Sequence, residues 1–235
     1  VAFTTNATNL LRNDFNGTSD IVLWVKDPGF IFAPNIYQIS LNSNEDPAVG
    51  GPSDNPALSQ HGNHIAFESQ ATNLDIRATG QNWQIFVRDF DLGCTTLLSV
   101  ALNGEIANSG SFDPSVSADG RFVAFHSDAN NLVSNDTNGS SDIFIVDRDA
   151  DGDGAFYSDA ANCIPGESLI TRASMGMDGA EANGGSFEPA MSASGEFVSF
   201  WSAATNLVEG DTNGLVDVFM YFTGITRTIE FEAPE

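Results

Sequence analysis

Short apolar runs alternate with polar, glycine-containing turns along the whole chain, and the alternation recurs at regular intervals. In its most regular copy, the apolar run 122–125 leads into a polar loop, and a second apolar run follows at 142–146. Four segments place a second run seventeen residues after an anchor phenylalanine: Phe3 to Asp20, Phe67 to Gln84, Phe125 to Asp142 and Phe200 to Asp217. Four loops of equal length predict one common geometry.

We expect each complete repeat to form four short strands. A Ser-x-x-Pro signal introduces the first strand, where a proline costs no ladder hydrogen bond, and a glycine turn supplies the positive φ of a tight hairpin before the second. β-branched and aromatic residues mark the third strand. The signals are Ser53 to Pro56, Ser111 to Pro114 and Ser186 to Pro189, with turns at 59–62, 117–120 and 192–195. Because the first repeat lacks its innermost strand, fifteen strands are expected, the last at 226–231.

Many short strands at even spacing, with glycine turns and no helical periodicity, are typical of small sheets repeated around an axis. The sequence therefore predicts an all-β protein, a β-propeller of four-stranded antiparallel blades. We expect one domain over residues 1–235, with repeats at about 1–52, 53–110, 111–185 and 186–235. Closure as a ring of four blades and membership of a larger ring both stay open.

The repeat resembles a known family, the TolB-type propeller repeat of bacterial envelope and secreted proteins. The residues that carry the resemblance are Pro114, Ser117, 119–121, 123–127 and 142–144, and they recur around Pro56 to Ser69 and around Pro189 to Ser202. The resemblance implies a propeller over nearly the whole chain and a bacterial, extracytoplasmic location. Such propellers serve as scaffolds, as binding surfaces and as domains attached to peptidases, so fold alone does not assign the function.

The loop between the second and third strands, called the crossing loop below, carries Asp-x-Asn-Gly-x-x-Asp in three of the four repeats. Oxygen-bearing side chains around a glycine turn, closed by a further carboxylate, are what Ca²⁺ recruits. The predicted calcium ligands are Asp14, Asn16 and Asp20; Asp136, Asn138 and Asp142; and Asp211, Asn213 and Asp217. The second repeat has Ala78, Gly80, Gln81 and Gln84 instead, and should bind no metal.

The alternative for these loops is that Asp and Asn cap turns through hydrogen bonds to the backbone, as they do in many loops without metal. Three repeats carry both carboxylates, and the remaining repeat has lost both. Pure capping does not require the two carboxylates to vanish together, so their coupled loss favours calcium.

A second acidic cluster lies in the insertion that lengthens the third repeat. Its predicted calcium ligands are Asp147, Asp149, Asp151 and Asp153. The pattern opens an EF-hand-type loop, but position twelve is Ser158 or Ala160 in the two registers, so the bidentate Glu is absent. Repulsion among these carboxylates favours a bound metal or disorder, and a solvated acidic loop is the alternative. In an antiparallel meander this insertion falls on the face opposite the crossing loops.

Cys94 and Cys163 both fall between the third and fourth strands of consecutive repeats, which places them on one face of neighbouring blades. We predict a disulfide between them, typical of an oxidising compartment, with two unpaired thiols as the alternative. His61, His64 and Glu68 form a small grouping, but zinc needs a fourth ligand and tetrahedral convergence. We therefore expect no zinc there.

Charge and motifs narrow the function. The chain has 32 Asp and Glu against 8 Lys and Arg, and a net charge of -24 repels phosphate backbones, so nucleic acid is not an expected partner. The longest apolar run, 21–25, is far shorter than the roughly 20 residues of a membrane helix. Since the sequence has no nucleophile elbow and no phosphate-binding glycine loop, we expect no enzyme. The start at Val1, inside a repeat strand, suggests a processed, truncated or partly observed chain.

The sequence therefore predicts a non-catalytic, calcium-stabilised propeller outside the bacterial cytoplasm that serves as a protein-binding or assembly scaffold. One alternative is the propeller portion of a larger secreted hydrolase or peptidase whose catalytic domain is not in this chain. Another is a subunit of a large extracytoplasmic assembly that is recognised through exposed strand edges of the first blade.

Overall fold

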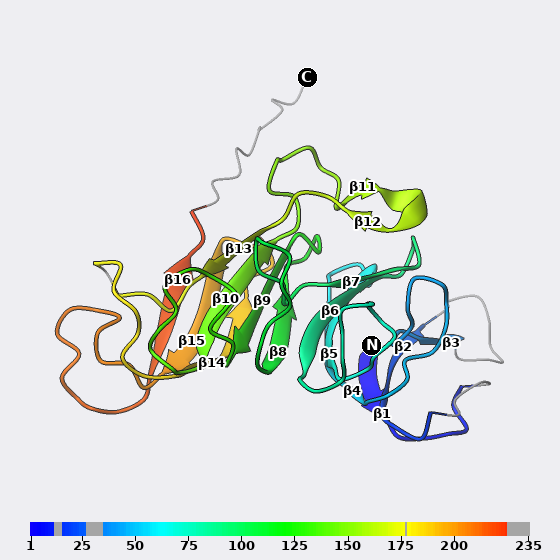
Figure 1. Ribbon diagram of the computed structural model, residues 1–235, viewed down its shortest axis with the longest axis horizontal. Helices are drawn as coiled ribbons and strands as arrows, with labels where there is room; N and C mark the ends of the chain where they lie inside the picture. The colour runs from blue at the N-terminus through cyan, green and yellow to red at the C-terminus, as the bar shows by residue number, and fades with distance from the viewer. Residues whose placement is uncertain (12–15, 27–34, 177, 225–235) are drawn as a thin grey trace.

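The computed structural model describes residues 1–11, 16–26, 35–176 and 178–224. These residues form four antiparallel sheets of three or four strands, called blades below, and one two-stranded sheet (Figure 1). Blade 1 comprises β1 (Ala2–Thr5), β2 (Asp20–Val25) and β3 (Asn35–Gln38), and blade 2 comprises β4 (Ser53–Leu58), β5 (His64–Ser69), β6 (Gln84–Asp89) and β7 (Cys94–Leu97). Blade 3 comprises β8 (Ser111–Val116), β9 (Phe122–Ser127), β10 (Asp142–Asp147) and β13 (Leu169–Arg172), and blade 4 comprises β14 (Ser186–Met191), β15 (Phe197–Ser202) and β16 (Asp217–Phe222).

The insertion, residues 148–168, leaves blade 3 between β10 and β13. It contains β11 (Tyr157–Asp159), the short 3-10 helix η1 (Ala160–Asn162) and β12 (Ile164–Pro165), and β11 pairs with β12. The sequence predicted neither this hairpin nor the helical turn. Among the described residues, no helix is long and apolar enough to cross a membrane.

The anchor phenylalanines hold the middle strands of the blades together. Phe67, Phe125 and Phe200 lie directly opposite Phe86, Phe144 and Phe219 on the next strand, with ring centroids 5.8, 5.9 and 6.0 Å apart. Cross-strand aromatic pairs are a main source of sheet stability. The constant seventeen-residue spacing therefore reflects a constant register, with the second and third strands paired in the same way in each blade.

Three apolar clusters fill the spaces between consecutive blades. One joins blades 1 and 2, one joins blades 2 and 3, and one joins blades 3 and 4. Because blades 2 and 3 lie between neighbours, every residue of β6 and β9 is buried, whichever face of the sheet it points to. The core is thus divided among blade interfaces, as expected for a propeller.

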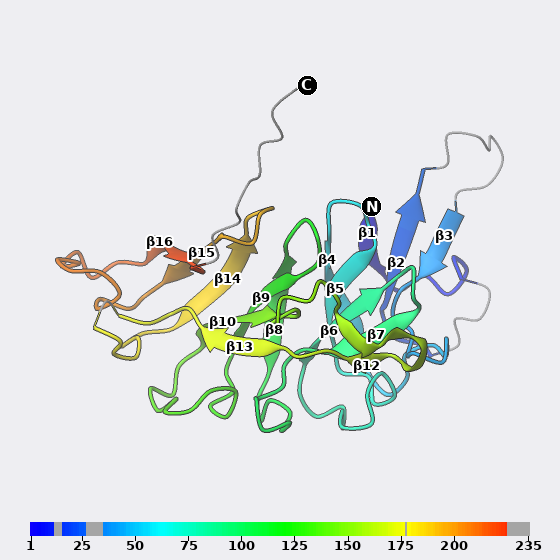
Figure 2. The ribbon, with the colours of Figure 1, turned by 90° about the horizontal axis from the view of Figure 1, so that it is seen from above.

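The blades form an arc with β16 of blade 4 at one end (Figure 2), and this strand exposes a core-like face. In blade 3, Ile143 and Ile145 are 0% and 4% exposed because blade 4 covers them, whereas the equivalent Val218 and Met220 of β16 are 79% and 71% exposed. Strand contacts link blades 1 to 2, 2 to 3 and 3 to 4. The described residues show no closed ring.

The Ser-x-x-Pro signals differ from expectation. Each proline is the fourth residue of its strand, and it follows a residue with positive φ: Asn55 at 48°, Asp113 at 51° and Glu188 at 50°. At these positions the pairing shifts, so that two residues face one on the next strand, which is a β-bulge. A proline is tolerated in a strand at a bulge, since no ladder hydrogen bond is due from it.

Other boundaries also shift. The turn before β5 spans 59–63 instead of 59–62, with the Gly62 amide donating to the Ser59 carbonyl over 3.0 Å. The expected strand at 226–231 lies outside the described residues. The all-β class and the four-stranded blades are confirmed for blades 2 and 3.

Phe125→Ala should destabilise the protein by about 4 kcal/mol, because it empties a fully buried site stacked on Phe144. The control is Phe222→Ala, since Phe222 is half exposed and should cost less than about 1.5 kcal/mol. Urea unfolding measures both. Equal losses would contradict the placement of the core between blades 2 and 3.

Candidate functional site

The crossing loop of blade 3 is a hydrogen-bonded network around Asp142. The Asn138 side-chain amide donates to the Asp142 carboxylate over 3.0 Å and to the Ala182 carbonyl over 3.1 Å. The Ser174 hydroxyl donates to the other carboxylate oxygen and accepts from the Ile143 amide over 3.1 Å. Asp142 thus joins the start of β10, the connection to blade 4 and the segment after β13.

The crossing loop of blade 1 repeats this network. The Asn16 amide donates to both oxygens of Asp20, over 3.2 and 3.1 Å, and to the Ala48 carbonyl over 3.0 Å. The Ser40 hydroxyl donates to Asp20 over 2.6 Å and accepts from the Ile21 amide. In blade 4, Asn213 donates to Asp217 over 2.9 Å. The predicted ligand Asp14 lies outside the described residues.

Blade 2 builds the same network from a single side chain. The Gln84 carbonyl oxygen accepts from the Ser99 hydroxyl, and its amide donates to the Ala107 carbonyl over 3.2 Å. Ser99 in turn accepts from the Ile85 amide over 3.1 Å. Gln84 therefore replaces the Asn side chain and the closing Asp together. This gives that Asn–Asp pair a structural reason to vanish as a unit, and calcium in the crossing loops stays a prediction.

A protein cation lies among the predicted calcium ligands of blade 3. The Arg172 guanidinium is buried, and its Nη1 lies 3.1 Å from Asp136, 3.2 Å from Asp142 and 2.9 Å from Glu181. In blade 1 the matching residue, Gln38, donates to Asp20 over 2.9 Å. The closing Asp of each of these two blades thus accepts a hydrogen bond from the outermost strand of its own blade, from a charged side chain in blade 3 and a neutral one in blade 1.

Burial and neighbouring charge perturb two of these acids in opposite directions. Burial raises the pKa of Asp136 to about 6; the nearby Asp142 carboxylate adds to the rise, and Arg172 opposes it. Hydrogen bonds from the Thr137 hydroxyl and amide, with a further contribution from Arg172, lower the pKa of Glu181 to about 2. One oxygen of Asp136 and both oxygens of Asp211 are buried without a hydrogen-bond partner among the described residues.

Three asparagines that sequence reasoning missed fasten each crossing loop to the preceding blade. The Asn131 side chain accepts from the Asn108 amide and donates to the Ile106 carbonyl, both over 2.9 Å. Asn73 and Asn206 make the same pair of bonds one blade earlier and one blade later. An Ala-x-Asn-Leu motif at a fixed place in each repeat was the available signal: 7–10, 71–74, 129–132 and 204–207.

The bulged prolines surround a groove of about 330 Å³ on the inner side of the blades, lined by residues of β4, β8 and β14. Here the Asn55 amide donates to Asp113 over 3.0 Å, and the Asp113 amide donates to Glu68 over 2.9 Å. Burial raises the pKa of Glu68. The left-handed residue before each proline costs roughly 1–3 kcal/mol, so this inner groove is held in shape by the surrounding packing.

The histidines do not form a metal site. His61 is exposed in its turn, His64 lies 3.3 Å from Asp89, and Glu68 lies at the far end of β5 from His64. His126 lies between the rings of Phe112 and Phe187 and 3.4 Å from Asp113. Its pKa is lowered, chiefly by burial.

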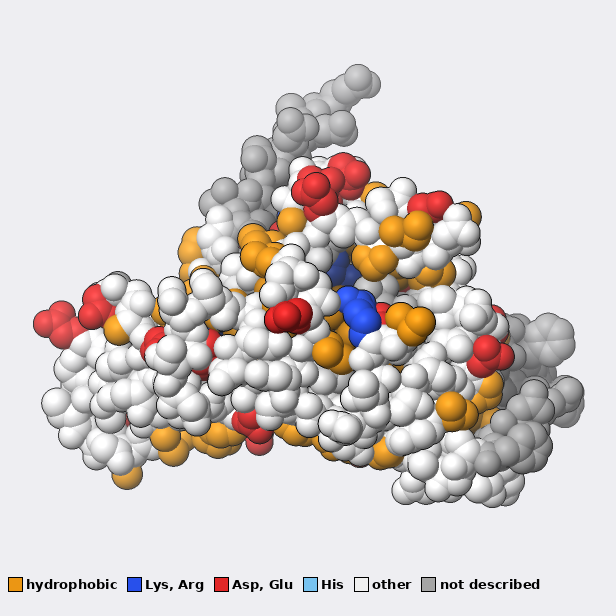
Figure 3. Space-filling model, in the orientation of Figure 1, with side chains coloured by type: hydrophobic (Ala, Val, Ile, Leu, Met, Phe, Trp, Pro, Cys, Tyr) orange, Lys and Arg blue, Asp and Glu red, His pale blue; other side chains and the backbone are white. Residues whose placement is uncertain are grey.

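Acidic side chains gather on the insertion, at the top of Figure 3. Carboxylate oxygens of Asp149, Asp151 and Asp153 lie within 4.8 Å of one another. The remaining predicted ligand, Asp147, is paired with Arg121 at 2.7 Å instead. Because the crossing loop precedes β10 and the insertion follows it, the two acidic regions lie at opposite ends of this strand.

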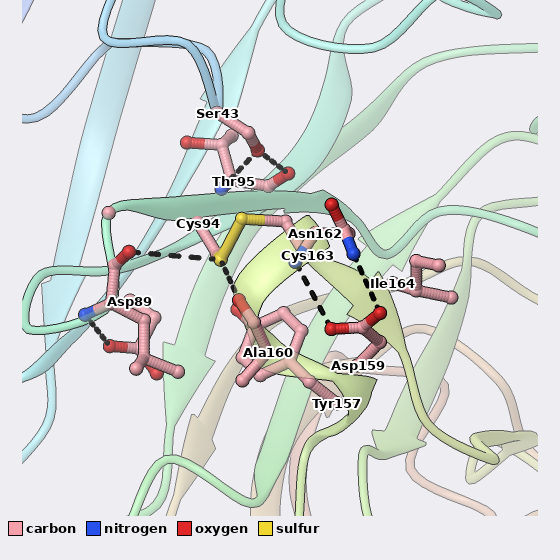
Figure 4. Close-up of a disulfide and its surroundings, with 12 residues drawn as sticks. Ser43, Asp89, Cys94, Thr95, Tyr157, Asp159, Ala160, Asn162, Cys163 and Ile164 are labelled. Atoms are coloured by element: carbon pink, nitrogen blue, oxygen red, sulfur yellow. Dashed lines mark hydrogen bonds between the residues drawn. A yellow bond between two sulfur atoms is a disulfide. The ribbon is translucent and has the colours of Figure 1, made fainter.

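The insertion is bonded covalently to blade 2. Cys94 of β7 and Cys163, which follows η1, form a disulfide with Cα atoms 5.3 Å apart, so the predicted pairing is present (Figure 4). Asp159 caps η1 by accepting from the Asn162 amide and side chain, over 3.3 and 2.7 Å. Asp159 therefore belongs to this cap and does not close the acidic loop.

No protein-family model matches the chain, and a search of curated proteins finds no significant match. Solved structures do match. TolB from Acinetobacter baumannii is 15% identical over 95% of this chain and 39% of that chain, with a TM-score of 0.45. A putative TolB from Agrobacterium tumefaciens is 18% identical over 94% of this chain and 61% of that chain, with a TM-score of 0.48.

The fold of the chain is similar to that of these two TolB structures. The chain spans 39% and 61% of the lengths of these two structures. The tricorn protease also matches, at 14% identity over 80% of this chain and 13% of that chain, with a TM-score of 0.42. At these identities the similarity concerns the fold alone.

Asp136→Asn should raise the melting temperature by about 2 °C or more at pH 7.5 and have no effect near pH 4. The folded pKa of about 6 exceeds the ordinary Asp pKa of 3.8, so ionisation of Asp136 costs stability progressively as the pH rises between these values. Arg172 keeps two carboxylate partners in the variant.

The control for this prediction is Glu209→Gln, which removes an exposed carboxylate from the crossing loop of blade 4. It should leave the pH dependence unchanged. Thermal melts from pH 4 to pH 8 compare the two variants with the wild type. A constant offset for Asp136→Asn at every pH would contradict the raised pKa.

Proposed function

We propose that this chain is a non-catalytic, calcium-stabilised propeller module that acts outside the cytoplasm as a protein-binding or assembly scaffold. The observation that carries the calcium proposal is the convergence of Asp149, Asp151 and Asp153 at the exposed end of the insertion. Carboxylate oxygens are the ligands that Ca²⁺ prefers, and backbone carbonyls and water complete its coordination.

The loop has the backbone shape that such a site requires. The Asp149 carboxylate accepts from the Gly154 amide over 3.1 Å, and Asp153 accepts from the Ala155 amide over 2.8 Å. Gly152 and Gly154 both have positive φ. These residues match the EF-hand-type register that starts at Asp149, with Gly154 in the sixth position. Since no Glu closes the loop, we expect moderate affinity.

Electrostatics supports a cation at this position. The chain carries a net charge of -24, and Arg121 reaches Asp147 and Asp149. Asp151 and Asp153 are exposed, and no ion pair among the described residues includes them. Ca²⁺ bound here would offset the repulsion between these carboxylates and stabilise the folded chain by mass action.

Two observations support the scaffold part of the proposal: an exposed apolar face on β16 and a disulfide. The exposed face of β16, with Val218, Met220 and Phe222, is apolar, and Val218 and Met220 match Ile143 and Ile145, which are buried in blade 3. Contiguous exposed apolar side chains of this kind mark interaction surfaces. The Cys94–Cys163 disulfide is consistent with an oxidising, extracytoplasmic compartment.

The same apolar face favours a second candidate, in which these blades are the propeller portion of a larger secreted hydrolase. A further blade or domain would then cover β16. Sedimentation separates the candidates: a scaffold module is a stable monomer or defined oligomer on its own, whereas a portion of a larger protein aggregates with increasing concentration. Hydrolase activity of the full gene product would favour the second candidate, the propeller portion of a larger hydrolase.

Calcium at 1 mM should raise the melting temperature of the EDTA-treated protein by about 5 °C at low salt. A shift of this size is expected when the calcium concentration is well above the dissociation constant. Asp151→Asn should abolish most of this shift, because it removes one of the three converging carboxylates. Differential scanning fluorimetry measures both.

Asp178→Asn is the matched control for the calcium experiment. Asp178 is exposed and accepts from the amide two residues ahead, as Asp151 does, but it lies outside the cluster. Its calcium shift should equal that of the wild type. An unchanged melting temperature on calcium addition would refute calcium stabilisation.

A further inference from the structure

A hollow of about 240 Å³ lies between blades 2 and 3, under the insertion. In Figure 3 it is the depression in which blue Lys and Arg side chains are visible, bordered by orange hydrophobic ones. Its volume corresponds to about eight water molecules at roughly 30 Å³ each. Two of the eight basic residues of this acidic chain, Arg77 and Arg148, line it.

Arg148 is the unusual member of the described arginines. There are five of them, and Arg77, Arg88, Arg121 and Arg172 each have a carboxylate within 4 Å. No ion pair among the described residues includes Arg148, although its side chain is buried, at 4% exposure for the residue. Asp89 and Asp119 attract it from further away, and Asp89 is itself engaged by His64.

A comparison with Arg88 shows that Arg148 has fewer hydrogen-bond acceptors and no carboxylate partner. Arg88, also buried, pairs with Glu45 and donates to the Asn42 and Gly93 carbonyls, over 3.0 and 2.7 Å, and to a hydroxyl. Arg148 donates to the Gly120 carbonyl over 2.8 Å and reaches a tyrosine hydroxyl only at 3.5 Å. A guanidinium offers five N–H donors and stays protonated in proteins, so Arg148 has donors and charge left over.

The surroundings of Arg148 define the chemistry of a ligand. Its guanidinium carbon lies 4.4 Å from the centre of the Phe156 ring, and the lining combines apolar side chains with the polar side chains of Arg77, Thr96 and Ser168. The apolar lining includes Leu97, Leu98, Val100, Val146 and Ile170. Apolar walls around one convergent charged group are typical of small-molecule sites. A buried unpaired charge is costly unless a partner of opposite sign satisfies it.

We propose that this hollow binds a small amphipathic carboxylic acid, whose carboxylate pairs with Arg148 and whose hydrocarbon part packs on the aliphatic walls. Arginine and carboxylate match in geometry as well as charge. A compact dianion such as phosphate fits less well, because it has no hydrocarbon part to pack on the aliphatic side chains of the lining. Arg77, at the rim, is already held by both oxygens of Asp75, over 2.9 and 2.8 Å.

The insertion completes this site. Phe156, Pro165, Gly166 and Ser168 of the insertion line the hollow, and blades 2 and 3 provide the rest. The Cys94–Cys163 bond holds the insertion against blade 2, so the roof of the hollow is tethered across the blade interface. The site is therefore formed before a ligand arrives, which lowers the ordering cost of binding.

Hexanoate tests the proposal, with 1-hexanol as the neutral probe of the same length and inorganic phosphate as the anion without an apolar part. Titrations followed by ligand-observed saturation-transfer NMR should show hexanoate binding at least about tenfold tighter than either of the others. Arg148→Met, which keeps the apolar volume, should weaken hexanoate at least about tenfold and leave 1-hexanol unchanged.

A second variant keeps the proposal testable if Arg148→Met does not fold. Leu102 is 68% exposed and lines the hollow, so Leu102→Asp places a negative charge beside the ligand and should weaken hexanoate several-fold. The matched control is Leu215→Asp, at a residue 67% exposed in blade 4, which should bind hexanoate as the wild type does. Equal binding of hexanoate and 1-hexanol, or equal weakening by the two Asp variants, would overturn the proposal and confine Arg148 to packing the insertion.

Discussion

Packing of one blade on the next is the interaction on which the rest of this structure depends. A single four-stranded sheet is too small to bury much apolar surface by itself, and here each blade interface holds its own apolar cluster. Because blades 2 and 3 have neighbours on both sides, their middle strands are buried on both faces. The same requirement explains β16, whose outer face has core side chains and no described blade to cover it.

The crossing loops add hydrogen bonds between neighbouring blades to this apolar packing. Asn131 fastens its loop to the connection from the preceding blade, and Asn138 reaches the connection to the following one. Each inter-blade connection is thus held from two sides. In blade 3 the Asp142 carboxylate accepts a hydrogen bond from Ser174 and pairs with Arg172. Its negative charge is therefore partly neutralised within the protein.

The insertion brings together features that the repeat alone lacks. It carries the acidic cluster at one end and half of the disulfide at the other, and between them it roofs the hollow beside Arg148. The acidic cluster and the disulfide lie at the end of β10 opposite the crossing loop, and the hollow extends from the insertion to Arg77 in the crossing loop of blade 2. Stabilisation of the insertion by metal and by the disulfide would therefore act on the shape of the hollow, which links the proposed calcium site to the proposed ligand site.

Local patterning was enough to predict the strands, the common register and the disulfide. The seventeen-residue spacing records the pairing of Phe125 with Phe144, because register in a buried sheet is set by which side chains face each other. The Cys94–Cys163 pairing followed from topology, since both cysteines lie in equivalent loops of adjacent blades. The extra hairpin of the insertion left no such periodic signal. The recurring Ser-x-x-Pro marked the start of each blade but did not reveal the bulge there.

By itself, the sequence determined the repeating antiparallel sheet and the residue types available to each loop, because periodicity and turn chemistry are local properties. Only the tertiary structure decided what those residues do. Arg172 reaches three acids from other segments of the chain, Gln84 replaces an Asn and an Asp at once, and Arg148 is buried without a carboxylate beside it. The physical reason is that charge pairing and burial depend on distances between strands and between blades, which no spacing along the chain encodes.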